Sequence, residues 1–344
     1  MELITNPMST HKHLANLFFT IVTALSMGAA SEPAPADQTM STDKHRFIEQ
    51  MSTQHGFNSA DVRDLLAQAR HDDKALRRIK NPAEALEWHQ YRQIFLTPER
   101  IRSGVDYWRE HADKVANTVN EYGVEAHILI AILGVESYYG KRSGDHRVLD
   151  ALSTLAFSYP PRGSFFRNEL EAFLLLTKQH GLDPKKVYGS YAGAMGKPQF
   201  ISSSYNHYAV SADGDERADL FNSAADALAS IANYLAQHGW IQGGPLAHKT
   251  ESQGTNCQGA LAPLNRPVKP EHLPKELTAR GVDVPGDIDS KDKLGLIKLN
   301  DTEESELWLT HNNFYVLTRY NHSALYAMAV YQLAKAILEE HQSW

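Results

Sequence analysis

Apolar residues recur every three or four positions between Thr97 and Gly123, and this spacing predicts one amphipathic helix. Thr97 can cap its first turn, Pro98 fits the first helical position, and Gly123 can end it. The next run, from Ile128 to Val135, is apolar on every side, which in a helix indicates burial on all faces. Glu136 follows directly, so the pattern predicts a carboxylic acid at the end of a buried helix.

Three more amphipathic helices are predicted further along the chain. One runs from Ser164 to His180, and one begins at Ser223, where Asp226 three residues on suggests a capping box. The last runs from Ser323 to about Glu340. The segment from about 97 to 240 is therefore expected to be all-helical.

Between the last two helices the composition changes. Prolines are frequent in residues 263–285, where no helical period is visible. Short strand-like runs follow at Leu296 to Leu299, Glu306 to Leu309 and Phe314 to Thr318. We therefore expect a small antiparallel β domain over residues 246–319.

The first 42 residues indicate export. Leu14 to Leu25 is an uncharged apolar run followed by the small residues Gly28, Ala29 and Ala30, an order typical of a secretory signal peptide. We assign residues 1–30 to the signal peptide and residues 31–42 to a linker, and we expect a periplasmic protein. An uncleaved N-terminal membrane anchor is the alternative. Because the only cysteine is Cys257, a lipid-modified N-terminal cysteine and an internal disulfide are both excluded.

The composition argues against a nucleic-acid-binding protein and against a zinc metalloprotease. The 344 residues are 42% apolar and 22% charged, which is ordinary for a globular protein, and the formal net charge of -7 gives no general attraction to nucleic acid. The 17 histidines include no His-Glu-x-x-His pairing of the kind that holds zinc in metalloproteases.

Glu136 is the best candidate for chemistry. Ionisation of a carboxylic acid against apolar helix residues forfeits hydration, so such a setting favours the neutral form that can donate a proton. A glutamate at the end of a buried helix can also cap a backbone amide or pair with an arginine. The local pattern alone therefore leaves a catalytic and a structural role open.

The motifs around Glu136 closely resemble those of the B-type lytic murein transglycosylases. The resemblance runs in order from about Phe47 to the C-terminus. Its motifs are Gly134-Val135-Glu136-Ser137-Tyr138-Tyr139-Gly140, Leu149-Asp150-Ala151-Leu152, Ser190-Tyr191-Ala192-Gly193-Ala194-Met195-Gly196, Gln199-Phe200, Ala232-Asn233-Tyr234 and Arg319-Tyr320-Asn321.

This resemblance implies a mainly α fold. A lysozyme-like helical catalytic core would span residues 97–245, beside an accessory helical domain of residues 43–96 completed by residues 320–344, and the small β domain. The implied reaction cleaves the β-1,4 bond between N-acetylmuramic acid and N-acetylglucosamine in peptidoglycan glycan strands. Glu136 would donate a proton to the leaving oxygen and then accept one from the muramoyl C6 hydroxyl, which leaves a 1,6-anhydromuramoyl end. No cofactor is required for this chemistry.

The resemblance also implies substrate-binding residues. Ser190 and Gln199 would hydrogen-bond the sugar or the catalytic carboxylate, and Arg162 would hold the peptide or lactyl carboxylate. Aromatic positions would supply ring faces and a hydroxyl; they are Phe200, Tyr234, Tyr320, Tyr91 and Tyr315. The chain departs from the family where Pro161 replaces one of two arginines and Phe165 replaces a tyrosine, so contacts to the peptide or lactyl part are in question.

Two alternatives to a lytic transglycosylase stay open. One is a muramidase that hydrolyses the same bond, although ordinary glycosidases use two carboxylates and the candidates here, Glu125, Glu169 and Glu171, are poorly placed. The other is a wall-binding protein without turnover. Proteins that synthesise or remodel the cell wall are candidate partners, and a monomer is expected.

An acidic loop resembles the calcium loop of some of these enzymes. Asp213, Asp215 and Asp219 alternate along residues 211–219, and Asp226 could close the site. Glu216 stands where a glycine would ease the turn. A structural calcium ion and a solvated acidic loop are therefore both compatible with the sequence.

Overall fold

The computed structural model of the chain describes residues 36–80, 85–212, 214, 216–253, 256–301 and 304–343, with side chains from residue 42 onward. The predicted signal peptide, residues 1–30, lies outside the described residues. The first helix, α1, begins at Ala36, so most of the segment expected to be a linker is helical where it is described.

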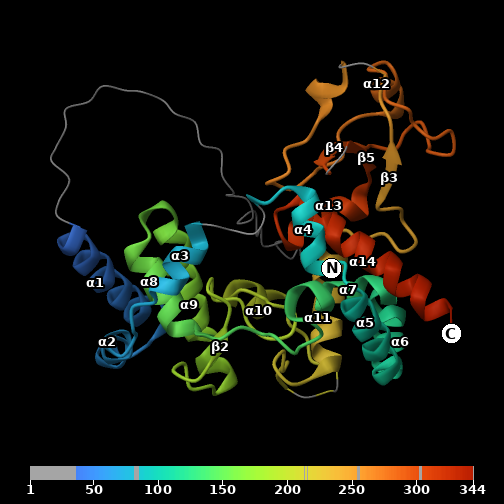
Figure 1. Cartoon of the computed structure of the whole chain (residues 1–344). Coiled ribbons are helices and arrows are strands. Elements are labelled where there is room, and N and C mark those ends of the chain that lie inside the picture. The colour runs from blue at the N-terminus through green and yellow to red at the C-terminus, as the bar shows by residue number, and fades with distance from the viewer. Residues whose placement is uncertain are drawn as a thin grey trace, which may run out of the picture.

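The fold is mainly helical, as predicted (Figure 1). The α-helices are α1 (Ala36–His55), α2 (Ser59–Ala67), α3 (Asp73–Lys80), α4 (Trp88–Phe95), α5 (Pro98–Glu110), α6 (Ala112–Tyr122), α7 (Ala126–Ser137), α8 (Val148–Ser158), α9 (Gly163–His180), α10 (Ser202–Tyr208), α11 (Ala224–Gln237), α12 (Pro274–Thr278), α13 (Asn312–Tyr320) and α14 (Ala324–Gln342). Two short 3-10 helices are η2 (Pro160–Arg162) and η3 (Asn256–Ala260).

Helix α7 lies at the centre of the core. Its residues from Ile128 to Gly134 are all buried, which agrees with the prediction of an apolar helix covered on all faces. Each such aliphatic side chain contributes about 1.5–3 kcal/mol when it is fully buried. Close packing continues at Gly134, where an added Cβ would lie 2.7 Å from the Tyr139 hydroxyl. This packing fixes the end of α7, where Glu136 lies.

The other helices form two groups around this centre. Helix α14 packs along α7, α5 and α4, whereas α1 and α3 contact α8, and α1 also contacts α9. Figure 1 shows these groups on opposite sides of the molecule, with α10 and α11 between them. The predicted domain boundaries, including an accessory domain completed by residues 320–344, stay a prediction.

One helix prediction and one strand prediction were wrong in detail. The expected single helix from Thr97 to Gly123 is two helices, because His111 leaves helical geometry (φ -116°, ψ 27°) and packs its ring against Tyr107. The strand-like run Phe314 to Thr318 lies within helix α13. Its apolar residues suit a strand as well as a helix, and packing of α13 on α14 and α11 selects the helix.

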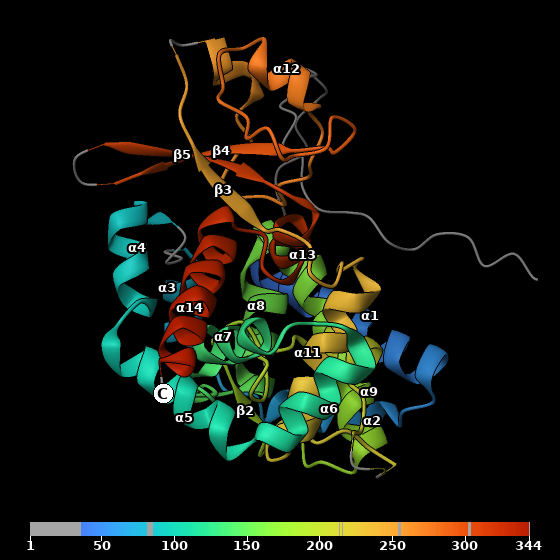
Figure 2. The same cartoon turned by 90° about the vertical axis from the view of Figure 1, so that its right-hand side faces the viewer.

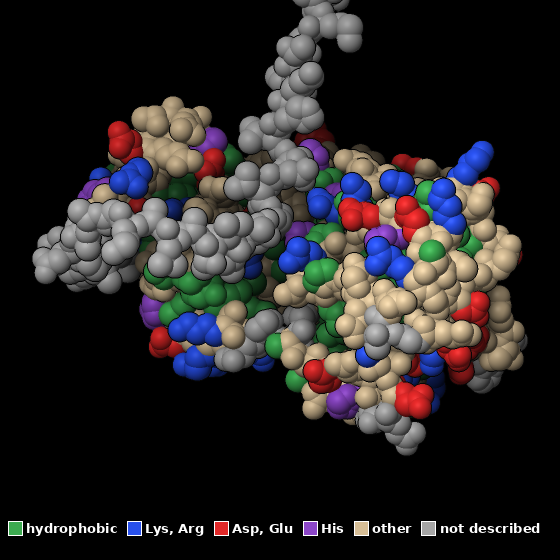
Figure 3. All heavy atoms as spheres, turned by 90° about the horizontal axis from the view of Figure 1, so that it is seen from above, with side chains coloured by type: hydrophobic (Ala, Val, Ile, Leu, Met, Phe, Trp, Pro, Cys, Tyr) green, Lys and Arg blue, Asp and Glu red, His purple; other side chains and the backbone are tan. Residues whose placement is uncertain are grey.

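The small β unit is a three-stranded antiparallel sheet in the order β3–β5–β4. Strands β4 (Gly295–Asn300) and β5 (Ser305–Thr310) match the two predicted runs, while β3 (Ala247–Thr250) was not predicted. Figure 2 shows this sheet projecting from the helical body beside α13, with α12 above it. On the face seen in Figure 3, acidic and basic side chains lie interspersed.

A second, two-stranded pairing supports the loops around Glu136. Strands β1 (His146–Arg147) and β2 (Tyr188–Gly189) are antiparallel, with His146 opposite Gly189. The pairing holds the segment after α7 against the Gly-rich turn that begins at Ser190.

Candidate active site

Glu136 lies in the last turn of α7 and is partly buried. Its Oε1 accepts a hydrogen bond of 2.7 Å from the hydroxyl of Tyr326, a residue of α14 that is only 2% exposed. A buried tyrosine hydroxyl needs a partner, and here that partner is the carboxyl group. The contact therefore fixes one oxygen of Glu136 and joins two segments that are 190 residues apart.

A second tyrosine lies beside this pair. Tyr320 is parallel to Tyr326, with ring centroids 6.2 Å apart and an interplanar angle of 6°. Burial raises the pKa of both hydroxyls well above the ordinary value, and the charge of the Glu136 carboxylate raises them further. Both tyrosines therefore stay protonated hydrogen-bond donors near Glu136.

Tyr320 continues into a cluster of aromatic rings. Its ring lies 5.8 Å from Phe200 and 4.9 Å from Tyr234, and Phe200 and Tyr234 are 5.9 Å apart. Hydroxyl groups tie the cluster to backbone: Tyr320 donates to the Pro198 carbonyl at 2.7 Å and Tyr234 to the Arg319 carbonyl at 2.6 Å. The structure thus brings Phe200, Tyr234 and Tyr320 together, and Tyr320 lies near Glu136.

Ser190 organises the Gly-rich turn. Its Oγ accepts hydrogen bonds from the backbone N–H groups of Ala192 and Ala194, at 3.2 and 3.0 Å. The turn then connects to Phe200, which exchanges two backbone hydrogen bonds with Met195. Ser190 is therefore a turn residue in this structure, and its hydroxyl proton is used in neither bond.

Gln199 bridges two loops. Its Nε2 donates to the carbonyl oxygens of Ser143 (3.0 Å) and Gly196 (2.9 Å). Gln199 has φ +51°, and among the described residues the other non-glycine residues with positive φ are Tyr138 and Tyr139. Such conformations cost about 1–3 kcal/mol each and concentrate at functional sites. All three flank Glu136 or its aromatic cluster.

Three predicted substrate-binding residues remain, and each lies against another aromatic residue. Tyr91 in α4 is buried and lies close enough to Tyr326 to affect its pKa, and Tyr315 in α13 does the same to Tyr234. Arg162 ends η2 with its guanidinium 4.3 Å from the Phe165 ring.

The three other acids considered as a second catalytic group are engaged elsewhere. Glu125 accepts hydrogen bonds from the Trp240 indole and the Gly243 backbone. Glu169 is buried, and its two oxygens accept from the backbone and hydroxyl of Ser203. Burial raises the pKa of Glu169, although those hydrogen bonds oppose the shift.

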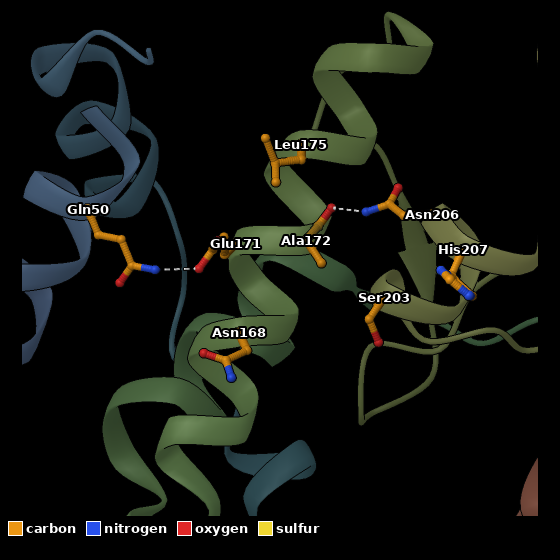
Figure 4. Close-up of a pocket in the computed structure, with 8 residues that line it drawn as sticks. All are labelled: Gln50, Asn168, Glu171, Ala172, Leu175, Ser203, Asn206 and His207. Carbon is orange, nitrogen blue, oxygen red and sulfur yellow. Dashed lines mark hydrogen bonds between the residues drawn. The ribbon is translucent and has the colours of Figure 1, made fainter. Parts of the chain in front are cut away.

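Glu171 lines a separate polar groove of about 520 Å³ between α1, α9 and α10 (Figure 4). Gln50 donates to one of its oxygens at 2.6 Å, and His55 Nε2 lies 2.7 Å from the other. The residues that line this groove include none of those predicted for substrate; they are Gln50, Asn168, Glu171, Ala172, Leu175, Ser203, Asn206 and His207.

The predicted calcium loop is described only in part, because Asp213 and Asp215 lie outside the described residues. Asp226 is buried and accepts backbone hydrogen bonds from Ala212 (2.9 Å) and Asp219 (2.7 Å). Burial opposes ionisation of Asp219, yet hydrogen bonds from Asn222 and Phe221 hold its pKa below the ordinary value. Among the residues that the structure describes, no group of three His, Cys, Asp or Glu side chains could hold a metal.

Tyr326 is the site residue that the sequence reasoning missed. It shares an inward face of α14 with Leu325 and Met328, so its position suggests only core packing. The available signal is chemical, because a tyrosine in the middle of a buried helical face must direct its hydroxyl at an acceptor.

Comparison with known proteins gives one family and several similar structures. Residues 39–335 match the model of the transglycosylase SLT domain. The crystal structure of soluble lytic transglycosylase SltB1 from Pseudomonas aeruginosa is 41% identical, with a TM-score of 0.80 over 87% of this chain and 99% of that one. The Escherichia coli lytic transglycosylase Slt35 in complex with calcium is 36% identical, with a TM-score of 0.78 over 87% and 94%.

A third similar structure contains a peptidoglycan fragment. SltB3 from Pseudomonas aeruginosa, in complex with NAG-anhNAM-pentapeptide, is 29% identical, with a TM-score of 0.72 over 88% of this chain and 80% of that one.

Proposed function

The chain belongs to the transglycosylase SLT domain family and is a lytic transglycosylase, and we propose that it cleaves peptidoglycan glycan strands with Glu136 as its single acid and base. The supporting observation is the contact of 2.7 Å between the Tyr326 hydroxyl and one oxygen of Glu136, at the end of a buried helix.

The reaction needs two proton transfers. Glu136, as the neutral acid, donates its proton to the glycosidic oxygen as the bond from that oxygen to C1 of N-acetylmuramic acid breaks. As the carboxylate, it then accepts the proton of the muramoyl C6 hydroxyl while that oxygen bonds to C1. Atoms balance without water, Glu136 regains its proton, and a 1,6-anhydro ring results.

The surroundings suit both states of Glu136. Tyr326 donates to the carboxylate and stabilises it between the two transfers, whereas the apolar end of α7 favours the neutral acid that begins the cycle. Because the acid, base and nucleophile come from Glu136 and the substrate, this chemistry needs no cofactor.

The aromatic cluster is proposed as the sugar-binding wall. Tyr320 lies near Glu136, Phe200 and Tyr234 pack against Tyr320, and sugar rings pack their C–H faces on aromatic rings. Gln199 Oε1 accepts no hydrogen bond from a described residue and can accept one from an acetamido N–H. By analogy with SltB3, we propose that the substrate carries peptide stems.

Mass spectrometry of digested sacculi tests the reaction. A lytic transglycosylase leaves anhydromuramoyl ends, which are about one water lighter than the reducing ends left by hydrolysis. We expect anhydro ends from this protein. Reducing ends would assign it to the hydrolytic muramidases. Sacculi that stay intact would indicate a protein that binds the wall without turnover.

We further propose export to the periplasm, where the substrate lies. The predicted signal peptide supports this location. Among the described residues, none of the helices has the length and apolar character needed to cross a membrane. A monomer, and partners from cell-wall synthesis or remodelling, stay predictions.

A structural calcium ion in the loop of residues 211–226 is also proposed. Asp219 and Asp226 lie within hydrogen-bonding distance of the same loop backbone, and hard cations prefer such oxygen ligands. Calorimetric titration of calcium into chelated protein should release heat and raise the melting temperature. Neither change would occur if the loop is only solvated.

A further inference from the structure

Arg100 is an unusual charged residue for a protein core. It lies in the first turn of α5 and is 8% exposed, yet its Nε and one terminal nitrogen have no hydrogen-bond partner within the described structure. Within the described part of the chain, Arg100 forms no ion pair with an Asp or Glu side chain. A buried guanidinium without an acceptor is unfavourable, so another group must compensate its charge.

Aromatic rings give part of that compensation. The Arg100 guanidinium carbon lies 4.9 Å from the Tyr138 ring centroid and 5.1 Å from that of Phe95. Tyr138 follows α7 in the left-handed conformation, with φ +51°. The C-terminal end of α7 adds a favourable negative potential for cations.

Further positive charges surround the same ring. Arg142 lies 5.1 Å and Lys141 5.7 Å from the Tyr138 centroid, and both side chains are exposed. Burial lowers the pKa of Arg100, the neighbouring tyrosines oppose this shift, and the charge of Arg142 adds to it. Two arginines therefore repel each other across one ring, in a chain whose net charge is negative.

This cationic cluster adjoins the candidate active site. The next residue, Ser143, accepts the hydrogen bond from Gln199 through its carbonyl. Gly144 then lies so close to the Gly-rich turn that an added Cβ would be 2.0 Å from the Gly189 oxygen. Arg142 is thus held at the rim of the region that contains Glu136.

We propose that Arg100 and Arg142, arranged around Tyr138, bind a carboxylate of the peptide stem carried by the glycan strand. Guanidinium groups match carboxylates in shape and charge, and an anion there relieves the repulsion between the two arginines. The exposed position of Arg142 suits a stem that projects from the sugar chain toward solvent. The inference rests on the proposed function for the identity of its ligand.

Binding of a product fragment tests this site without turnover. Calorimetry would compare the native protein with Arg142→Gln, using the disaccharide GlcNAc-anhydroMurNAc with a pentapeptide stem. Arg142→Gln removes an exposed charge, and we expect it to weaken binding about five- to tenfold, as loss of one charge-assisted contact does. Arg102→Gln is the matched control, because Arg102 is an exposed arginine of α5 beside Glu99.

Two modified ligands identify the group that is bound. With the stem carboxylates amidated, native protein and Arg142→Gln should bind equally. The stem-free disaccharide, which keeps its lactyl carboxylate, should also bind both proteins equally.

Equal affinity of both proteins for the native fragment would overturn the site, and so would an equal loss with the amidated fragment. A loss with the stem-free disaccharide would assign the site to the lactyl group and overturn the stem. The proposed function is tested separately: if it is wrong, the native enzyme releases no anhydro products from sacculi.

Discussion

At the residue scale, the important contact is the one between a buried hydroxyl and a carboxyl group. Tyr326 has little access to water, so its hydroxyl depends on Glu136 as its acceptor. Burial, together with the charge of Glu136, raises the pKa of the Tyr320 and Tyr326 phenols and keeps both protonated. Two variants separate the proton transfer from the positioning.

Glu136→Gln should keep the fold and glycan binding but lose turnover by a factor of at least about 10³, in the upper part of the range for general acid–base groups. The amide keeps the shape of the side chain but cannot donate and recover a proton. Release of anhydromuropeptides, quantified by chromatography, measures the loss. Substantial turnover in this variant would contradict the single-acid mechanism.

Tyr326→Phe should lower kcat about tenfold with little change in KM, because the ring still packs while the carboxylate loses one hydrogen bond. Tyr331→Phe is the control. Tyr331 lies on the same helix, but its hydroxyl donates to the Ala247 carbonyl. Equal kinetics for the two variants would argue against a positioning role for Tyr326.

The sequence predicts residues of this site unevenly. Glu136 stands out because an acid directly follows an apolar run, and Phe200, Tyr234 and Tyr320 were selected through the family motifs. Tyr326 was not predicted, because only the tertiary structure brings its buried hydroxyl to a carboxyl group 190 positions away.

At the element scale, local signals located most helix ends. Thr97, Ser223 and Ser323 each accept a backbone hydrogen bond at a helix start, as their residue type predicts. The break at His111 and the helix at Phe314 had no such signal. At Phe314, packing of α13 on α14 and α11 decided the outcome, and periodicity does not contain that information.

The loop of residues 211–226 gives an element-scale prediction. Asp226→Asn should lower the free energy of unfolding by about 1–3 kcal/mol, because one amide oxygen cannot replace the two that accept from Ala212 and Asp219. Urea denaturation in the presence of a chelator measures this loss without any contribution from metal.

Asp287→Asn serves as the control, since Asp287 is an exposed acid in another loop. Equal stability of the two variants would show that the backbone hydrogen bonds to Asp226 contribute little.

At the scale of the whole molecule, a histidine pair connects the β unit to the helical body. His311, just before α13, is 6% exposed, and its Nε2 lies 2.9 Å from His248 Nδ1 on β3. Burial lowers the pKa of His311 to about 4, and the charge of His248 contributes. Between pH 6.5 and about 4, His311 therefore binds a proton in the unfolded chain but stays neutral in the folded protein.

This histidine should make the protein less stable as the pH falls. The pKa of His311 is lowered in the folded state from 6.5, so its contribution to stability is present above pH 6.5 and is lost as the pH falls toward 4. The loss from this residue amounts to at most about 3 kcal/mol. His311→Asn should therefore lose less stability than the native protein between pH 7 and pH 4.5 in urea denaturation.

His71→Asn, which changes an exposed histidine, should follow the native curve. A native pH dependence in His311→Asn would show that other groups cause the acid sensitivity.

The mainly helical fold class and the position of the small sheet near the end of the chain were predictable, because apolar periodicity and proline content change there. The way in which α14 returns to cover α7 was not, since no local feature of residues 324–342 specifies a neighbour so far back along the chain.

The packing of α14 on α7 determines when the site around Glu136 is completed during synthesis of the chain. A growing chain displays Glu136 long before the helix that contains Tyr326 has been synthesised. Until α14 is present, Glu136 lacks the hydrogen bond from Tyr326, and α7 lacks the helix that packs along it. We therefore expect the site around Glu136 to be complete only after α14 has docked on α7.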